Sequence, residues 1–161
     1  MVDVAIVGAG LAGLTAANRA AQLGHAVIVL EQGTGDDYLC PRRLAPGEVN
    51  FAHSNPELPA NVLVDAIMAD TEDHADPALA RAMANVAGHG LGWLRDEGAE
   101  FILRGIQGKQ SFMMAPAKTF QAGLVWKGDG PDVFLRRLKD NLQKRGGQML
   151  GGARATSLIV R

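Results

Sequence analysis

Three glycines, Gly8, Gly10 and Gly13, lie between an apolar run and an alanine-rich segment. This GxGxxG spacing is typical of a turn whose backbone N–H groups, with the positive end of the following helix, hold nucleotide phosphates. The first glycine permits a tight turn, the second lets the backbone approach a pyrophosphate, and the third lets the helix pack closely. Glu31 lies eighteen residues beyond Gly13, where a carboxylate accepts hydrogen bonds from ribose hydroxyls. The pattern therefore predicts binding of an ADP group, and the acid disfavours NADP because it would repel a 2′-phosphate.

The elements around the glycines agree with this interpretation. Val2 to Val7 is almost continuously apolar and too short for a helix, which is typical of a buried parallel strand. Leu11 to Leu23 is rich in alanine and leucine and is followed by a glycine, so we expect a helix there. Ala26 to Leu30 is a second apolar run, ending next to Glu31. Together these segments predict a βαβ unit with the glycines at its first turn.

The rest of the chain is organised less regularly. Glycine and proline pairs predict an ordered loop from Glu31 to Pro59, and a glycine-rich mixture of loops and short strands runs from Gly98 to Pro131. Apolar residues at helical spacing predict three more helices, of which the last begins with a proline and ends at two glycines. The predicted helices are Asn61–His74, Pro77–Glu97 and Pro131–Arg145, and the predicted strands are Glu100–Leu103, Ser111–Ala115, Leu124–Trp126, Gln148–Leu150 and Ala153–Val160.

Composition narrows the class of protein. The chain has 161 residues, a size that fits one domain, and its formal net charge is −1. A balanced charge gives no counterion-release contribution to nucleic-acid binding, so we expect no nucleic-acid partner. No apolar run is long enough to span a membrane, and no signal peptide is evident, so a cytoplasmic location is expected. The single cysteine, Cys40, excludes an internal disulfide and a cysteine-based metal cluster.

The spacing of the strands favours FAD over NAD. The glycine fingerprint serves both cofactors, but a plain NAD domain would reach its third strand soon after Glu31. Here about a hundred residues intervene before the helix from Pro131 and the strand at Gln148, which would complete the sheet by a right-handed crossover. We therefore expect an α/β, Rossmann-like FAD-binding domain with a parallel sheet of strand order 3-2-1. A mainly helical insertion is expected at about residues 57–127, and residues 1–161 are expected to be the N-terminal part of the domain.

Four segments carry a resemblance to a known family. They are DVAIVGAGLAGLTAANRAAQLGHAVIVLEQG, YLCPRRLAPGEVNFAH, DPALARAMANVAGHGLGWLRDEGAEF and WKGDGPDVFLRRLKDNLQKRGGQMLGGARATSLIVR. With these segments the chain resembles the N-terminal part of the FAD-dependent fumarate reductase and succinate dehydrogenase flavoproteins, particularly their soluble branch that includes tricarballylate dehydrogenase. The resemblance implies a flavin oxidoreductase acting on a di- or tricarboxylate-type acid. It also implies that the catalytic groups lie beyond residue 161, so that this chain alone is catalytically incomplete.

The resemblance also assigns cofactor contacts. Covalent attachment in such proteins uses a histidine where this chain has Cys40 to Arg43, so noncovalent FAD is expected. Arg42 or Arg43 could pair with a phosphate, the alternative being an exposed arginine pair on the surface. A backbone group near Ala153 to Ala155 is implied at the adenine edge. The residues expected to contact FAD are Gly8, Ala9, Gly10, Leu11, Ala12, Gly13, Glu31, Gln32, Arg42, Arg43 and Ala155.

Two other functions stay open at this point. The chain could be a stand-alone nucleotide-binding or interaction module without redox activity, or part of an NAD-dependent enzyme. In a sheet of order 3-2-1 the first strand would lie at an open edge, and an exposed apolar edge favours self-association. We therefore expect association between copies through the strand from Val2 to Val7.

Overall fold

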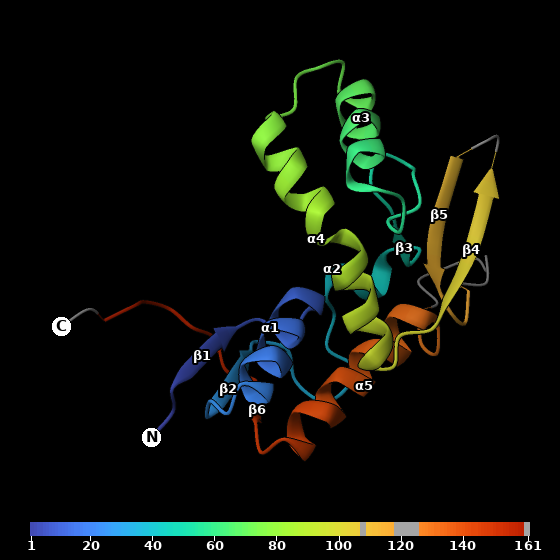
Figure 1. The fold of residues 1–161 in the computed structure, drawn as a ribbon. Coiled ribbons are helices and arrows are strands. Elements are labelled where there is room, and N and C mark those ends of the chain that lie inside the picture. The colour runs from blue at the N-terminus through green and yellow to red at the C-terminus, as the bar shows by residue number, and fades with distance from the viewer. Residues whose placement is uncertain (107–108, 118–125, 160–161) are drawn as a thin grey trace.

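The computed structural model describes residues 1–106, 109–117 and 126–159 (Figure 1). A parallel sheet lies at the N-terminal end, built from β1 (Val4–Val7), β2 (Val27–Glu31) and β6 (Gln148–Gly151) in the order β1-β2-β6. Val4 is opposite Val27, and Ile28 is opposite Gln148. The predicted parallel sheet with the late strand beside β2 is therefore confirmed.

Two helices lie side by side against this sheet, α1 (Leu11–Gln22) and α5 (Gly130–Lys144) (Figure 1). The apolar side chains of α5 repeat at helical spacing and are buried in one cluster with those of α1 and β2. Asn18, which is fully buried in α1, donates from Nδ2 to the Leu138 carbonyl of α5 at 2.8 Å. This polar contact fixes how the two helices sit against each other. The cluster includes Leu14, Ala17, Val27, Val29, Phe134, Leu135, Leu138 and Leu142.

A helical hairpin of α3 (Ala60–Asp70) and α4 (Pro77–Asp96) rises away from the sheet (Figure 1). Asp76 caps α4, because its side chain accepts hydrogen bonds from the first N–H groups of the helix. At the other end of α4, the buried carboxylate of Glu97 receives two hydrogen bonds from Arg145, which follows α5. The long helix is thereby tied to the helices of the sheet domain at its C-terminal end.

A second, antiparallel sheet follows the order β3-β5-β4 and consists of β3 (Glu48–Val49), β4 (Phe101–Ile106) and β5 (Lys109–Met114). Phe101 is opposite Met114, and Glu48 is opposite Met113. A single turn of helix, α2 (Pro41–Leu44), precedes β3. The two predicted strands around residues 100–103 and 111–115 are thus confirmed as the hairpin of β4 and β5.

Three expectations need correction or fall outside the described residues. The stretch from Glu31 to Pro59 is not wholly irregular, because it contains α2 and β3. The predicted strand Ala153–Val160 is wrong over the described residues 153–159, which form no strand and leave Leu158 and Ile159 exposed. Branched apolar residues favour a strand mainly where they can pack against the side chains of a neighbouring strand. The predicted strand Leu124–Trp126 lies outside the described residues except for Trp126, which is not in a strand.

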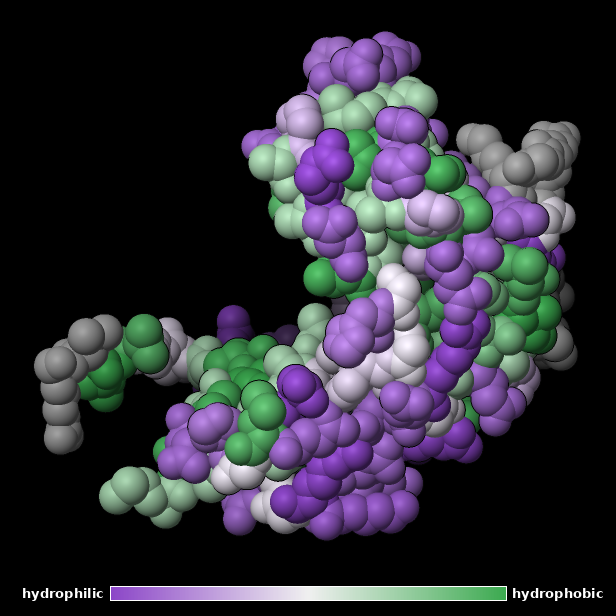
Figure 2. Space-filling view, in the orientation of Figure 1, coloured by the Kyte–Doolittle hydropathy of each residue, from purple (hydrophilic) through white to green (hydrophobic). Residues whose placement is uncertain are grey.

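β1 lies at the edge of the described parallel sheet, as expected from the strand order. Figure 2 shows apolar surface around this edge and along the C-terminal arm, whereas the face formed by α5 is largely hydrophilic. Val7 in β1 is 68% exposed. Association through this edge stays a prediction. Among the described residues, every helix is too short or too polar to cross a lipid bilayer.

Candidate nucleotide site

The glycine turn connects the end of β1 to the first turn of α1. Gly8 adopts φ +95°, a conformation that favours glycine, and its N–H donates to the Leu30 carbonyl of β2 at 2.7 Å. A β-carbon placed on Gly13 would lie 1.9 Å from the Gly8 carbonyl oxygen. Gly8 is therefore favoured by its backbone conformation, whereas Gly13 is required by the packing of the helix against the turn.

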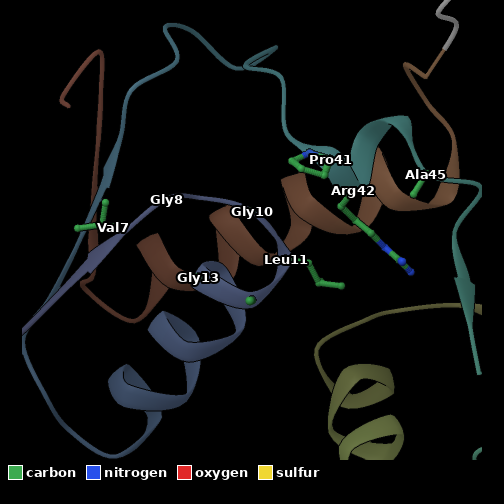
Figure 3. A pocket seen from close by; sticks show the side chains of 9 residues that line it. Val7, Gly8, Gly10, Leu11, Gly13, Pro41, Arg42 and Ala45 are labelled. Carbon is green, nitrogen blue, oxygen red and sulfur yellow. The ribbon is translucent and has the colours of Figure 1, made fainter. Parts of the chain in front are cut away.

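Gly10 has a different reason to be glycine. Its backbone is extended, with φ −71° and ψ −178°, and a β-carbon there would meet no protein atom within 4 Å. That space belongs to an open pocket of about 520 Å³ (Figure 3). The pocket is lined by Val7, Gly8, Gly10, Leu11, Ala12, Gly13, Pro41, Arg42 and Ala45. A side chain on Gly10 would enter the volume that a ligand needs, although the protein fold would tolerate it.

The N-terminus of α1 faces this pocket. Gly10 is the N-cap residue, and no side chain caps the helix. The helical hydrogen bonds begin with the bond from Leu14 N–H to the Gly10 carbonyl, at 2.9 Å. No acidic residue lies in the first turn. Its initial N–H groups and the positive end of the helix dipole are thus available to an anion without a competing carboxylate.

Glu31 lies at the end of β2 with its side chain 7% exposed. One carboxylate oxygen accepts a hydrogen bond from Ala9 N–H at 2.8 Å, and the other accepts one from Gly33 N–H at 2.8 Å. An ionised carboxylate offers about four lone-pair sites, so acceptors remain for two ribose hydroxyls. Glu31 therefore also holds the glycine turn in place, a role that the spacing alone did not indicate.

A second pocket, of about 220 Å³, is lined in part by Glu31. Gln32 and Ala155 line it as well, which brings the predicted adenine-side residue next to the predicted ribose acid. The contact depends on the chain after β6, because Ala153 N–H donates to the Glu31 carbonyl at 2.9 Å. Val7 and Gly8 line both pockets, so the two form one path over the carboxyl ends of β1 and β2.

Arg42 borders the first pocket from α2 but turns its guanidinium away from the glycines (Figure 3). Its terminal nitrogens approach the Glu48 carbonyl at 3.3 and 3.4 Å, and its buried Nε has no hydrogen-bond partner. Burial lowers the pKa of Arg42 from its ordinary value. No carboxylate pairs with Arg42 among the described residues. Arg42 therefore adds an unneutralised positive charge to the α2 side of the pocket.

Arg43 is not part of an exposed arginine pair, since it is 1% exposed. Its Nε lies 3.0 Å from Asp132 of α5, and its Nη2 donates to the Asp36 carbonyl at 2.9 Å. The guanidinium also lies 4.5 Å from the ring centre of Tyr38 and 4.9 Å from that of Trp126. Arg43, which was considered for a phosphate contact, is thus engaged by other residues of the protein. It anchors the loop before α2 to α5.

Sequence reasoning missed Tyr38. Its hydroxyl donates to the Ala9 carbonyl at 2.6 Å, in the middle of the glycine turn. The side chain is 4% exposed, and burial raises the pKa of Tyr38 to about 12. The available signal was a single aromatic residue in an otherwise polar loop seven residues after Glu31, a weak indication without the fold.

The residues on this path fit the ADP part of FAD. Open space lies at the Gly10 β-carbon position and at the α1 N-terminus, and Glu31 carries free acceptors beside a pocket lined by Ala155. The fold and site together define a dinucleotide-binding domain of the Rossmann type. A family model described as the FAD binding domain matches residues 3–161, and the chain belongs to this family. FAD is therefore its cofactor.

Comparisons with known proteins agree with this assignment. The chain is 29% identical over 168 residues to the vinyl phenol reductase of Lactiplantibacillus plantarum, covering 97% of this chain and 30% of that protein. The 3-ketosteroid-delta4-(5alpha)-dehydrogenase of Rhodococcus jostii RHA1 has the same fold, with a TM-score of 0.78, 18% identity and 98% of this chain covered. Sdh1 of Mycobacterium smegmatis follows with a TM-score of 0.66, 19% identity and 94% of this chain covered.

The predicted resemblance to the fumarate reductase and succinate dehydrogenase flavoproteins is confirmed at the level of the FAD-binding domain. The chain spans 30% of the length of the curated relative, and it covers 39% and 27% of the two solved chains.

Proposed function

We propose that residues 1–161 form the ADP-binding part of the noncovalent FAD site in a flavin-dependent oxidoreductase. The observation that carries the proposal is the continuous path from Ala155 and Glu31, across Gly8, to the N-terminus of α1. An adenosine group fits the Glu31 end, where ribose hydroxyls find acceptors. The pyrophosphate fits the helix N-terminus, where N–H groups are available. The flavin then extends toward α2 and Arg42.

Bound FAD supplies hydride chemistry, and the residues of this chain bind and orient it. We propose that the groups that act on the substrate lie outside residues 1–161. Support comes from the two pockets on the cofactor path, whose titratable side chains are Glu31, Arg42 and Arg154. Glu31 is engaged by the backbone N–H groups of Ala9 and Gly33, and an arginine stays protonated, so these side chains make a poor acid–base pair. The chain alone should therefore bind the cofactor without turning over a substrate.

The substrate class is part of the proposal. The sequence resemblance favours a di- or tricarboxylate-type acid, whereas the relative from Lactiplantibacillus plantarum is named for a vinyl phenol. A fumarate-like acid and a vinyl phenol each have a carbon–carbon double bond that could accept a hydride from a reduced flavin. Anaerobic oxidation of the reduced flavin in the complete protein, by fumarate-like acids in one arm and by vinyl phenols in the other, decides between them.

The binding assignment is tested by competition. The flavin fluorescence of FAD should change on titration with the purified protein, and an excess of ADP should reverse this change by displacing FAD. FMN and riboflavin, which lack the ADP group, should compete far more weakly. Equal competition by FMN would contradict the assignment, and so would tight NAD binding without any flavin binding.

A further inference from the structure

The peptide groups on both sides of Ala9 are held by side chains from other parts of the chain. Ala9 N–H donates to the Glu31 carboxylate at 2.8 Å, and the Ala9 carbonyl accepts a hydrogen bond from the Tyr38 hydroxyl at 2.6 Å. Ala9 itself is fully buried. The residue between the first two glycines therefore has no freedom to rotate its backbone while both contacts are made.

The Tyr38 contact fixes the direction of the next N–H group. A trans peptide is planar, and its C=O and N–H bonds point in opposite directions. When Tyr38 holds the Ala9 carbonyl, the Gly10 N–H must point away from Tyr38. Within the part of the chain that the structure describes, the Gly10 N–H has no hydrogen-bond acceptor. Gly10 lines the pocket at the N-terminus of α1, where the phosphates are expected.

Tyr38 is in turn held rigidly. The guanidinium of Arg43 stacks on its ring at 4.5 Å and donates a hydrogen bond to its backbone carbonyl. Arg43 is paired with Asp132 in the first turn of α5, and Asp132 also accepts a hydrogen bond from Gly128 N–H at 2.9 Å. A chain of contacts thus runs from α5 through Arg43 and Tyr38 to the glycine turn.

We propose that Tyr38 is a positioning residue for the cofactor pyrophosphate, orienting the Gly10 peptide from behind through its hydrogen bond to the Ala9 carbonyl. The proposal rests on the proposed placement of the pyrophosphate at the N-terminus of α1. Tyr38 touches no ligand in this role, because it lies on the protein side of the turn. Its raised pKa, about 12 as a result of burial, keeps the hydroxyl protonated and able to donate throughout the ordinary pH range.

Tyr38 and Glu31 are expected to affect different parts of the ligand. Glu31 lies beside the ribose pocket and has acceptors of its own for the ligand. Tyr38 lines neither of the two pockets on the cofactor path. Loss of the Tyr38 hydroxyl should therefore weaken ligands that carry phosphates and spare ligands that carry only adenosine. A purely structural role would affect both kinds of ligand alike.

The test compares Tyr38→Phe with the unchanged protein. Phenylalanine keeps the ring that packs on Arg43 and removes only the hydroxyl. The dissociation constants of ADP and adenosine are measured by calorimetry or ligand-observed NMR, with the melting temperature as a check of folding. Thr71→Val is the matched control, since it removes a hydroxyl that bonds the Ile67 carbonyl at 2.8 Å far from the turn.

ADP should bind Tyr38→Phe about threefold to tenfold more weakly, the range expected for one hydrogen bond, while adenosine binding is unchanged. Equal weakening of ADP and adenosine, or no weakening of either, would overturn the proposal. If Tyr38→Phe does not fold, Arg43→Lys decides in the same way, since it keeps the charge beside Asp132 but loses the planar stack on Tyr38. Failure of the unchanged protein to bind ADP would instead refute the proposed cofactor site.

Discussion

The backbone N–H of Ala9 donates to the buried carboxylate of Glu31 at 2.8 Å, joining the glycine turn after β1 to the end of β2. An acid at this position is expected to hold ribose hydroxyls, but here it also closes the turn that faces the phosphates. The same carboxylate accepts from Gly33 N–H, so one side chain holds both the glycine turn and the loop directly after β2. Glu31 is therefore expected to serve the glycine turn as well as the ribose.

This double role predicts the effect of Glu31→Gln. The amide keeps one acceptor oxygen but places an NH₂ group against either Ala9 N–H or Gly33 N–H, leaving a buried donor unsatisfied. We expect unfolding in urea to become easier by about 1–3 kcal/mol and adenosine binding to weaken. Adenosine affinity equal to that of the unchanged protein would show that Glu31 does not contact the ribose.

Gly13→Ala should disturb the fold itself. The new β-carbon would overlap the Gly8 carbonyl oxygen, which is backbone and cannot move without opening the turn. We expect a loss of about 1–3 kcal/mol in the free energy of unfolding, together with a loss of FAD binding. Gly88→Ala in α4 is the control, because its β-carbon would meet no atom within 4 Å. A stable Gly13→Ala variant that binds FAD normally would contradict the packing of the turn.

Arg42 should act on the flavin side of the cofactor and not on the ADP side. Removal of its charge by Arg42→Met is expected to weaken FAD binding about tenfold, as for one hydrogen bond to a charged group, and to leave ADP binding unchanged. The loss should shrink at high salt because charge interactions are screened. Arg81→Met, on the exposed side of α4, provides the matched control. Parallel losses for ADP and FAD would place Arg42 at the pyrophosphate instead.

The loop that carries Tyr38 should respond to acid. Hydrogen bonds from Lys127 and Arg136 lower the pKa of Asp37 from 3.8 to about 2. A lowered folded-state pKa stabilises the protein above the unfolded value of 3.8, and this contribution is lost as the pH falls from 3.8 toward 2. Because Asp37 is exposed, we expect a small effect. The melting temperature of Asp37→Asn should approach that of the unchanged protein near pH 2. A difference in melting temperature that stays constant from pH 6 to pH 2 would refute a stabilising role of the Asp37 carboxylate.

The sequence predicted the βαβ unit well because its signals are local. The glycine spacing, the apolar runs and the acid at the end of β2 lie within thirty-one residues, and each has one dominant physical reason. The pairing of β6 with β2 was also predictable, since a right-handed crossover leaves few alternatives.

Other features depended on contacts between distant parts of the chain. Arg43 was considered as a surface residue because arginine is mostly exposed. In the structure it is buried and paired with Asp132, which lies eighty-nine residues later in the chain. Tyr38 gains its role only where its loop folds back over Ala9. The residues from Ala153 onward have strand-like composition but no neighbouring strand among the described residues. Local patterns do not contain this information.

Titration of FAD into the unchanged protein and into Gly10→Val tests the central claim most directly. A β-carbon at Gly10 meets no protein atom within 4 Å and φ is −71°, so the two proteins should melt at similar temperatures. The valine side chain fills the volume assigned to the pyrophosphate, and the affinity for FAD should fall by at least about a hundredfold. Unchanged FAD affinity in a folded Gly10→Val variant would show that the cofactor does not bind at the N-terminus of α1.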